Sequence, residues 1–543
     1  MERKAFMSTE ETPPDITMPA AADIKAEVEV RKEKEAETYP PDDGDDGSGI
    51  PLSFIATCLH AEKVGDGSLY AEVHKDKYLF CHVMNRWLVW TGHHWQTDRG
   101  RTAEREVEAV VAQYLRLIPA IDKQIKKLAE EEDSEAIIKG LNKRKGFVHN
   151  RIKGIRKPSG IADCLTMATI VQNNIAIIGD EIDRNPWLLG FNNGVMDLRT
   201  GKFRDGRPDD YILNAIPHDW EGFDAEAEDF DKFMQVIFEE NEAVINYVLR
   251  FFGYGLIGAV IEHVFLVMHG EHGRNGKSTL MGILQHVLGA LMQPIQSEML
   301  LDQKTPRNPG AASPHITALK GLRVAFASET TEKSTFSPGQ IKWLTGGDKL
   351  TGRENYGKES ITFDPTHLLC LLTNELCKAP PNDKAFWYRM HVLNFKLSFV
   401  DSPKEDHERK RDPMLTEKLK KETPGILARL VKGCIEWKRS LDADGDGLKP
   451  PKEVLEATDQ YRKDQDLAGE FISMKFTEEP DFTRSTPLGD IYDEFEEWYQ
   501  ENKGDKVPSR TWLSKELAKK RFIKCTKGGN LKFYGAQLAR FTV

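Results

Sequence analysis

A short glycine-rich stretch near the middle of the chain carries the residues best suited to chemistry. Five apolar residues, 264–268, predict a buried strand, and a turn ending in Gly276-Lys277-Ser278-Thr279 leads into a predicted helix. In this order, backbone N–H groups and a helix N-terminus converge on phosphate oxygens. Lys277 is expected to reach the β- and γ-phosphates of ATP, and Ser278 to place its hydroxyl on Mg²⁺. The predicted nucleotide-binding residues are Gly273, Arg274, Asn275, Gly276, Lys277, Ser278 and Thr279.

The glycine spacing departs from the usual phosphate-loop pattern. The pattern G-x-x-x-x-G-K-[ST] needs a glycine five residues before Gly276, where this chain has Glu271. The nearest upstream glycines are Gly270 and Gly273, so we expect a loop one residue longer than the standard form. The alternative is a glycine-rich turn with an unrelated lysine. It is disfavoured because the strand, loop and helix signals occur together.

Acidic residues follow a second predicted strand, 322–328. Glu329 comes directly after this strand and Glu332 three residues later. A carboxylate at a strand's carboxyl end, beside a phosphate loop, can hold Mg²⁺ through water and polarise the attacking water. Glu329 is therefore the predicted catalytic and metal-binding acid, with Glu332 second. An ordinary loop acid is the alternative.

Two further polar residues complete the predicted catalytic set. Asn374 ends a third apolar run, 367–373, and its amide can hydrogen-bond the γ-phosphate or align the attacking water. Arg389 follows fifteen residues later. An arginine from a neighbouring subunit can stabilise charge on a transferring phosphoryl group, whereas a structural salt bridge is the alternative role.

Charge, cysteine content and hydropathy indicate the compartment of the protein. Net charge is −11, and residues 1–50 hold fourteen acids and six bases, so most of the acidity lies in a segment predicted to be a disordered tail. The seven cysteines form no C-x-x-C pair, and no apolar run has the length of a membrane helix. These features predict a soluble, cytoplasmic protein without a membrane partner.

Residues 51–262 are predicted to form two folded regions. Residues 51–218 predict an α/β domain with hairpins near 86–95 and 194–203 and a helical region from about 103 to 174. Within it, residues 139–157 hold eight Lys or Arg and no acid, which is typical of a solvated helix face or of a nucleic-acid surface. Residues 219–262 predict two amphipathic helices that form a helical collar.

With these motifs in order, the chain resembles the superfamily 3 helicases, specifically the phage, plasmid and poxvirus-type replicative primase-helicase family. The resemblance covers roughly residue 87 to the C-terminus. It rests on 275–279, Ala327-Ser328-Glu329, Leu372-Thr373-Asn374, Asn193-Gly194-Val195 and, most specifically, on Lys342-Trp343-Leu344-Thr345-Gly346-Gly347-Asp348. The family commonly has Trp-Arg-Arg where this chain has Trp387-Tyr388-Arg389, which leaves Arg389 as the only arginine finger.

The resemblance implies an AAA+-like P-loop NTPase core at 263–400 in a ring, expected to be a hexamer. It also implies a channel hairpin from Lys349 to Phe363 that grips single-stranded DNA, although an ordinary exposed hairpin would look similar. The candidate DNA contacts on this hairpin are Lys349, Arg353, Tyr356 and Lys358. The primase fused to larger relatives is not expected here, so a separate primase or polymerase is the expected partner.

The C-terminal third predicts a helical region, 401–477, and a winged-helix DNA-binding domain, 478–543. Its DNA-facing candidates are Lys519, Lys520 and Arg521, with use in protein contact only as the alternative. Residues 442–453 satisfy the EF-hand pattern, but Lys449 and the prolines after it favour an acidic turn between helices over a calcium site.

Together these features predict an ATP-dependent hexameric helicase that translocates on single-stranded or forked DNA during replication of a phage or other mobile element. If a phage encodes it, the compartment is the bacterial cytoplasm. Two alternatives remain open. One is a ring ATPase that acts on RNA or packages DNA, and the other is an origin-binding protein that uses ATP only for assembly.

Overall fold

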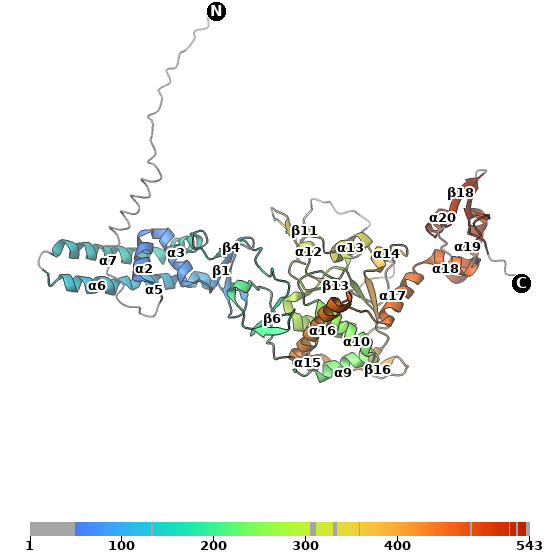
Figure 1. Ribbon diagram of the computed structural model, residues 1–543, viewed down its shortest axis with the longest axis horizontal. Coiled ribbons are helices and arrows are strands. Elements are labelled where there is room, and N and C mark those ends of the chain that lie inside the picture. Colours follow the sequence, from blue (N-terminus) through green and yellow to red (C-terminus); the bar gives the residue numbers. More distant parts are fainter. Residues whose placement is uncertain are drawn as a thin grey trace, which may run out of the picture. The chain divides into compact units, whose positions relative to one another are not determined.

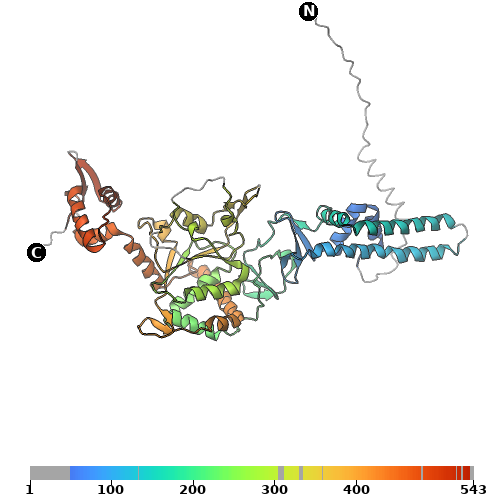
Figure 2. The same cartoon turned by 180° about the vertical axis from the view of Figure 1, so that it is seen from behind.

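The computed structural model describes residues 49–131, 134–303, 311–328, 334–357, 359–477, 481–520, 522–527 and 530–538 (Figures 1 and 2). Its internal contacts divide the chain into two compact units. Unit 1 comprises the described residues up to Trp90 together with Gln96–Glu181, and unit 2 comprises Thr91–Trp95 and the described residues from Ile182 onward.

Unit 1 is mainly helical, with one small sheet. Its strands, in the order β3-β2-β1-β4, are β3 (Trp95–Thr97), β2 (Arg86–Trp90), β1 (Tyr78–Cys81) and β4 (Ala176–Ile177). Its helices are α2 (Leu52–His60), α3 (Glu62–Val73), α4 (Thr102–Arg105), α5 (Val107–Leu115), α6 (Leu117–Leu128), α7 (Glu135–Ile155) and α8 (Pro158–Ala168). The helical region predicted at 103–174 is therefore confirmed, and α6 and α7 lie side by side as a helical hairpin (Figure 1).

Part of the basic run at 139–157 stabilises unit 1 itself. Arg151, on α7, donates from Nε to Oδ1 of the buried Asp66 at 3.0 Å, and the Tyr114 hydroxyl donates to the same oxygen at 2.9 Å. Lys145 pairs with Asp122 at 2.8 Å. A buried carboxylate such as that of Asp66 needs such partners, so Arg151 has a structural role, while the Lys145–Asp122 pair joins α7 to α6.

Unit 2 is built on a five-stranded sheet in which every pairing is parallel. Its strands, in the order β14-β8-β13-β10-β9, are β14 (Met390–Asn394), β8 (Phe265–His269), β13 (Leu368–Thr373), β10 (Val324–Ser328) and β9 (Met292–Pro294). The three apolar runs interpreted as strands from the sequence are β8, β10 and β13. The predicted α/β class is confirmed, and the structure adds that the sheet is parallel. Parallel strands covered on both faces are expected to be continuous apolar runs, as these three are.

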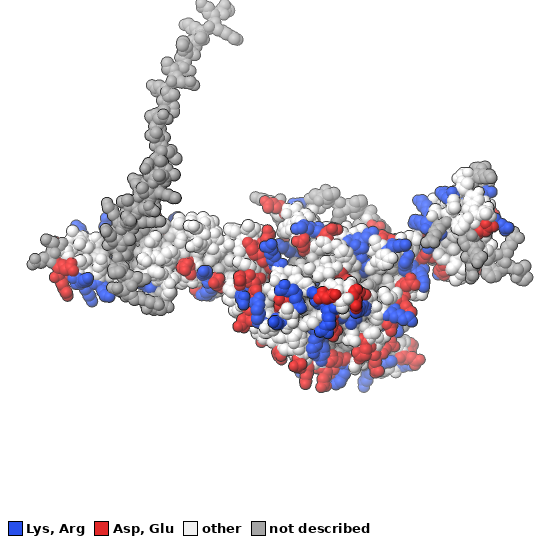
Figure 3. Space-filling model, in the orientation of Figure 1, with Lys and Arg blue, Asp and Glu red and all other residues white. Residues whose placement is uncertain are grey.

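Four helices, grouped together in Figure 1, pack into one apolar cluster with this sheet. They are α9 (Glu228–Ile237), α10 (Glu242–Tyr254), α15 (Leu415–Lys421) and α16 (Thr423–Asp444). The predicted amphipathic faces supply buried Phe230, Phe233, Tyr247 and Phe251. Helix α9 begins with acidic residues, which favour a helix N-terminus, and Figure 3 shows acidic side chains over this part of unit 2.

Shorter elements surround the sheet. The helices are α11 (Lys277–Leu288), α12 (Pro314–Thr317), α13 (Pro338–Thr345) and α14 (Lys384–Trp387), and the strands are β11 (Leu350–Gly352), β12 (Ile361–Phe363), β15 (Ser398–Val400) and β16 (Glu408–Lys410). None of the described helices of the chain combines the length and apolarity that a bilayer-spanning segment needs.

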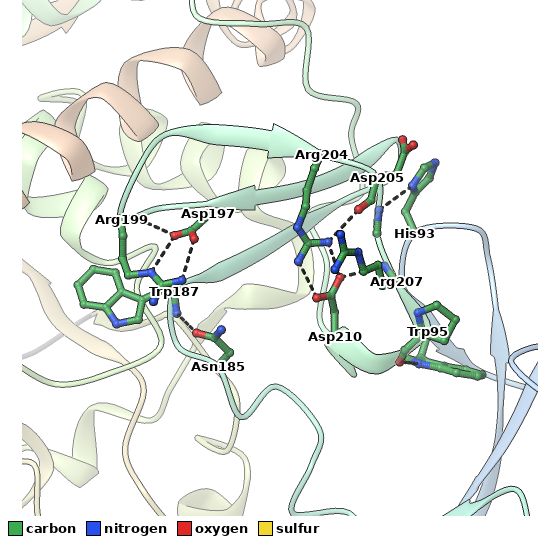
Figure 4. A network of polar contacts seen from close by, with 12 residues as sticks. His93, Trp95, Asn185, Trp187, Asp197, Arg199, Arg204, Asp205, Arg207 and Asp210 are labelled. Atoms are coloured by element: carbon green, nitrogen blue, oxygen red, sulfur yellow. Dashed lines mark hydrogen bonds and ion pairs between the residues drawn. The ribbon is translucent and has the colours of Figure 1, made fainter.

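A three-stranded sheet of β5 (Leu188–Phe191), β6 (Gly194–Asp197) and β7 (Lys202–Arg204) also belongs to unit 2, and it contains the hairpin expected at 194–203. Figure 4 shows its polar network. Asp210 accepts two bonds from the Arg204 guanidinium, at 2.8 and 2.6 Å, and Trp95 Nε1 donates to the Pro208 carbonyl at 2.8 Å. Residues 182–218, expected to fold with the N-terminal domain, have their internal contacts in unit 2. The domain boundaries themselves stay predictions.

The C-terminal part of unit 2 follows α17 (Lys452–Asp464) and α18 (Leu467–Lys475). It contains α19 (Leu488–Asn502), α20 (Arg510–Lys519) and a sheet ordered β17-β19-β18, with β17 (Ser485–Pro487), β18 (Ile523–Lys527) and β19 (Asn530–Tyr534). Phe495, Trp498 and Phe533 are among its buried core residues. The described residues of the segment expected to be a winged helix thus contain two helices followed by the antiparallel pair β18 and β19.

Candidate nucleotide-binding site

The glycine-rich loop joins the carboxyl end of β8 to the start of α11. Gly276 has a φ of +89°, and a Cβ there would lie 2.9 Å from the Ile237 side chain, so glycine is required. The first backbone bond of the helix runs from Leu280 N to Gly276 O at 2.9 Å. The N–H groups of the first helical turn therefore have no partner within the helix and can bind an anion.

Lys277 and Asn374 meet at this end of the sheet. Lys277 Nζ donates to Asn374 Oδ1 at 2.8 Å and to the Gly270 carbonyl at 3.3 Å. Strand β13 places Asn374 there because it pairs in parallel with β8, with Thr373 opposite His269. The Lys277 side chain is buried, with 5% of the residue exposed, and this burial lowers its pKa to about 8. Two predicted catalytic residues, far apart in the sequence, are thus in direct contact.

Asn275 holds the loop in shape. Its side-chain amide donates to the carbonyls of His272 at 2.6 Å and Gly270 at 3.3 Å, and the residue is buried. These bonds close the loop on itself. The side chain of the predicted nucleotide-binding residue Asn275 therefore orients the loop.

A cavity of about 400 Å³ adjoins the loop and is lined by Arg274–Thr279 and Asn374. Sequence reasoning missed the other lining residues, namely Phe233, Phe399, Arg411, Asp412, Pro413, Leu415 and Thr416. A cavity of this size with convergent polar groups is typical of a small-ligand site. Their local sequence gave no signal, because Phe233 was interpreted as part of an amphipathic helix and residues 411–416 as part of a helical region.

The expected metal-binding pair is partly visible. Ser278 lines the cavity next to Lys277. Strand β10 brings Ser328 opposite Leu372, at the same edge of the sheet, but Glu329 and Glu332 lie outside the described residues. A hydroxyl beside a phosphate site fits Mg²⁺, which prefers few protein oxygens together with substrate phosphates. In the described parts of the chain, no three His, Cys, Asp or Glu side chains cluster as metal ligands.

Arg389 lies away from the phosphate loop of its own chain. It directly precedes β14, whose first residue, Met390, pairs with Phe265 at the start of β8. The loop follows the other end of β8, roughly 20 Å along the strand at about 3.3 Å per residue. Arg389 Nη1 donates to the Ala385 carbonyl at 2.9 Å. The structure therefore does not bring this fourth predicted catalytic residue to the site of the same chain.

The predicted channel hairpin is present as the antiparallel pair β11 and β12. Tyr356, near its tip, is fully exposed and has a φ of +63°. Arg353 Nη1 donates to the Gly357 carbonyl at 3.2 Å, and Lys349 pairs with Asp364 at 3.6 Å. Lys358 lies outside the described residues. Of the described candidates, Tyr356 projects furthest into solvent.

The basic residues at the end of α20 make ion pairs within unit 2. Lys519 Nζ lies 2.6 Å from Glu516 Oε1, and Lys520 pairs with Asp466 at the start of α18. The Lys520 side chain is only 22% exposed. Arg521 is outside the described residues. Lys520 therefore joins α18 to α20, which its position in a basic run did not suggest.

The EF-hand-like segment forms a helix end and a turn. Helix α16 ends at Asp444, and Gly445, with a φ of +75°, caps it. Asp442 pairs with Lys438 and Asp444 with Lys449, while Glu453 accepts a bond from Asn241 at 2.8 Å. These carboxylates have partners of their own, in keeping with the expected acidic turn.

The fold is a parallel α/β sheet with a glycine-rich loop between β8 and α11, and comparisons with known proteins add its relatives. Residues 68–239 match the family described as "D5 N terminal like". "Putative helicase L207/L206" of Acanthamoeba polyphaga mimivirus is 31% identical over 341 residues, covering 60% of this chain and 34% of the relative. "Putative helicase 184R" of Invertebrate iridescent virus 6 is 26% identical over 508 residues, covering 85% and 51%. "Putative primase C962R" of African swine fever virus (isolate Tick/Malawi/Lil 20-1/1983) is 24% identical over 367 residues, covering 62% and 35%.

The chain thus spans about a third to a half of the length of these relatives. The family match and the viral relatives confirm the predicted resemblance to the phage, plasmid and poxvirus-type replicative primase-helicase family of superfamily 3. Among solved structures, the apo NrS-1 C terminal region overlaps with a TM-score of 0.34 at 10% identity, covering 66% of this chain and 83% of its own.

Proposed function

We propose that the chain is an ATP-dependent DNA helicase motor that moves along single-stranded DNA during replication of a large DNA virus or related mobile element. The contact between Lys277 and Asn374, 2.8 Å apart at the mouth of a cavity of about 400 Å³, carries this proposal. The relatives named as helicases and primases of large DNA viruses support it.

In this proposal, unit 2 contains an AAA+-like P-loop core in which different residues bind the phosphates, align the attacking water and hold Mg²⁺. The N-terminal amides of α11 and the Lys277 ammonium bind the β- and γ-phosphates, and Asn374 aligns the attacking water. Ser278 and Glu329 would hold Mg²⁺, which when bound shields the phosphate charge. The buried position of Lys277 strengthens its attraction to phosphate, because less water screens the charge.

Arg389 is proposed to act on the nucleotide of a neighbouring copy. It lies at the opposite end of β8 from the phosphate loop, so one copy cannot supply both Lys277 and Arg389 to one nucleotide without refolding. A head-to-tail interface with a closing rotation makes such a shared site and produces a ring. Six subunits, with α9 and α10 as a collar, are the expected arrangement.

The proposed DNA contacts lie on two elements. Tyr356, with Lys349, Arg353 and Lys358, would bind the strand in the ring channel through base stacking and phosphate contact. The C-terminal part is proposed to be a winged helix that binds duplex DNA at a fork, with Lys519 as its most exposed described candidate. The expected compartment is the host cytoplasm and the expected partner a primase or polymerase.

The test is steady-state ATP hydrolysis by the full chain, with and without single-stranded DNA, for wild type and Lys277→Ala. The proposal expects hydrolysis that DNA stimulates and that the alanine variant loses. RNA-specific stimulation would favour the ring ATPase acting on RNA, and stimulation by duplex DNA alone would favour a packaging motor. ATP binding without turnover would favour an origin-binding protein.

A further inference from the structure

The phosphate loop is one residue longer than the usual form, and its exposed side rests on a neighbouring element. This element, here called the arm, comprises residues 398–410, in which β15 and β16 pair in parallel with Ser398 opposite Glu408. The extra length of the loop and the contacts of the arm with the loop have no role in the function proposed above.

Three contacts join the arm to the loop. Ser398 Oγ donates to the Gly273 carbonyl at 2.9 Å, and Phe399 N donates to the Arg274 carbonyl at 2.9 Å. The imidazole rings of His272 and His407 stack, with centroids 4.0 Å apart and planes 19° from parallel. Two consecutive loop carbonyls and one loop side chain are therefore fixed from outside the loop.

These contacts also set the direction of the loop amides. In a trans peptide, the N–H of the next residue points opposite to the carbonyl. Holding the carbonyls of Gly273 and Arg274 on the arm therefore turns the N–H groups of Arg274 and Asn275 away from it. Arg274 has a φ of +60°, a conformation that a non-glycine residue adopts only when its surroundings impose it.

The arm also reaches the cavity, because its Phe399 is one of the lining residues. Arg411 N donates to the Val400 carbonyl at 2.9 Å, and the chain continues directly into further lining residues, namely Arg411, Asp412, Pro413, Leu415 and Thr416. The lengthened loop, the arm and these lining residues are thus parts of one connected structure.

We propose that the arm is a brace that preorganises the lengthened phosphate loop for phosphate binding, with Ser398 and His407 as positioning residues. The inference rests on the proposed nucleotide site. Removing a brace widens the range of conformations of the free loop, so binding weakens while the bound geometry is unchanged. An interaction that supports ground and transition states equally changes KM and leaves kcat in place.

The test measures the Kd of a fluorescent ATP analogue, together with KM and kcat for ATP, in the full chain. Ser398→Ala, His272→Ala and His407→Ala are each expected to raise Kd and KM by about three- to tenfold with little change in kcat, as for one lost hydrogen bond or ring pair. His407→Phe keeps a flat ring for the stack and should bind nearly as wild type. Glu405→Gln is the matched control, because it removes the carboxylate 3.4 Å from His407 but keeps the stack.

A double-mutant cycle separates the stack from a general effect on folding. If the two rings act only through their stack, the double variant His272→Ala/His407→Ala should bind the ATP analogue with the same Kd as either single variant. His272 is exposed on the loop, so its substitution leaves the core of the fold intact. Wild-type Kd and KM in all three alanine variants, or additive losses in the cycle, would overturn the brace. Wild-type nucleotide binding by Lys277→Ala would instead overturn the proposed site itself.

Discussion

At the scale of single residues, Lys277 links nucleotide binding to pH. Burial lowers its pKa to about 8, so the free protein loses this positive charge as pH rises through that value. A bound triphosphate favours the ammonium form, and binding then requires uptake of a proton above that pH. We expect the Kd for ATP to rise between about pH 8 and 9.5, by up to about tenfold per pH unit.

Lys277→Arg is the control for this pH effect. A guanidinium stays charged over the whole range, so the variant should bind ATP with an affinity that changes much less with pH, whatever its absolute value. Kd measured by titration of a fluorescent ATP analogue at several pH values gives the comparison. Parallel pH profiles for the wild type and the arginine variant would contradict this role of Lys277.

Tyr356 is the residue whose exposure most favours contact with a DNA strand. Tyr356→Ala should weaken single-stranded DNA binding by about 1–3 kcal/mol, the range for one lost base-stacking contact. Tyr356→Phe keeps the ring and should bind as wild type. Fluorescence anisotropy with a labelled oligonucleotide measures both variants. If the alanine variant retains wild-type affinity, the hairpin does not bind DNA through this ring.

At the scale of elements, α10 and α16 cross closely because both carry glycine at the crossing. A Cβ on Gly433 would lie 2.2 Å from the Leu249 carbonyl oxygen, and one on Gly253 would lie 2.4 Å from Cys434 N. Gly433→Ala should therefore lower the free energy of unfolding by about 1–3 kcal/mol, since the two helices must move apart.

Gly282→Ala, in helix α11, is the matched control for this crossing. No atom lies within 4 Å of a Cβ at Gly282, so alanine there should raise stability by about 0.5–1 kcal/mol through the lower entropy of the unfolded chain. Thermal unfolding of both variants gives the comparison. A Gly433→Ala protein as stable as the wild type would mean that the helices are not in tight contact.

The elements best predicted from the sequence are those with local signals. Three apolar runs followed by polar residues became β8, β10 and β13, and Asn374 lies where a parallel neighbour of β8 must end. The edge strands β9 and β14 were not predicted. Strand β9 has only three residues, and the sequence just before β14 was interpreted only for the possible catalytic role of Arg389.

Only part of the candidate site could be predicted from the sequence. The phosphate loop and Asn374 follow from local pattern, but the lining residues within 411–416 and the arm at 398–410 depend on chain segments that meet only in three dimensions. The Lys520–Asp466 pair joins residues 54 positions apart. The contiguous basic run therefore predicted a surface role for Lys520, whereas the structure shows that this lysine connects α18 and α20.

At the scale of the whole molecule, the proposed hydrolysis depends on cooperation between copies of the chain. Arg389 and the phosphate loop lie at opposite ends of the same strand pair, β14 and β8. This geometry suits a ring in which each copy presents its arginine to the nucleotide of the next. An isolated copy should therefore bind ATP but hydrolyse it slowly.

The most direct measurement is ATP hydrolysis by mixtures of two inactive variants, Arg389→Ala and Lys277→Ala. The rate of ATP hydrolysis by each variant alone should be reduced by about 10³-fold or more, the range for loss of an arginine finger or of a phosphate-binding charge. Mixed subunits should regain part of the activity, because some interfaces then pair an intact Lys277 with an intact Arg389 from the neighbouring copy. Recovery on mixing is the result that the account predicts. Activity that stays at the level of the separate variants, or an Arg389→Ala protein as active as the wild type, would contradict the shared site.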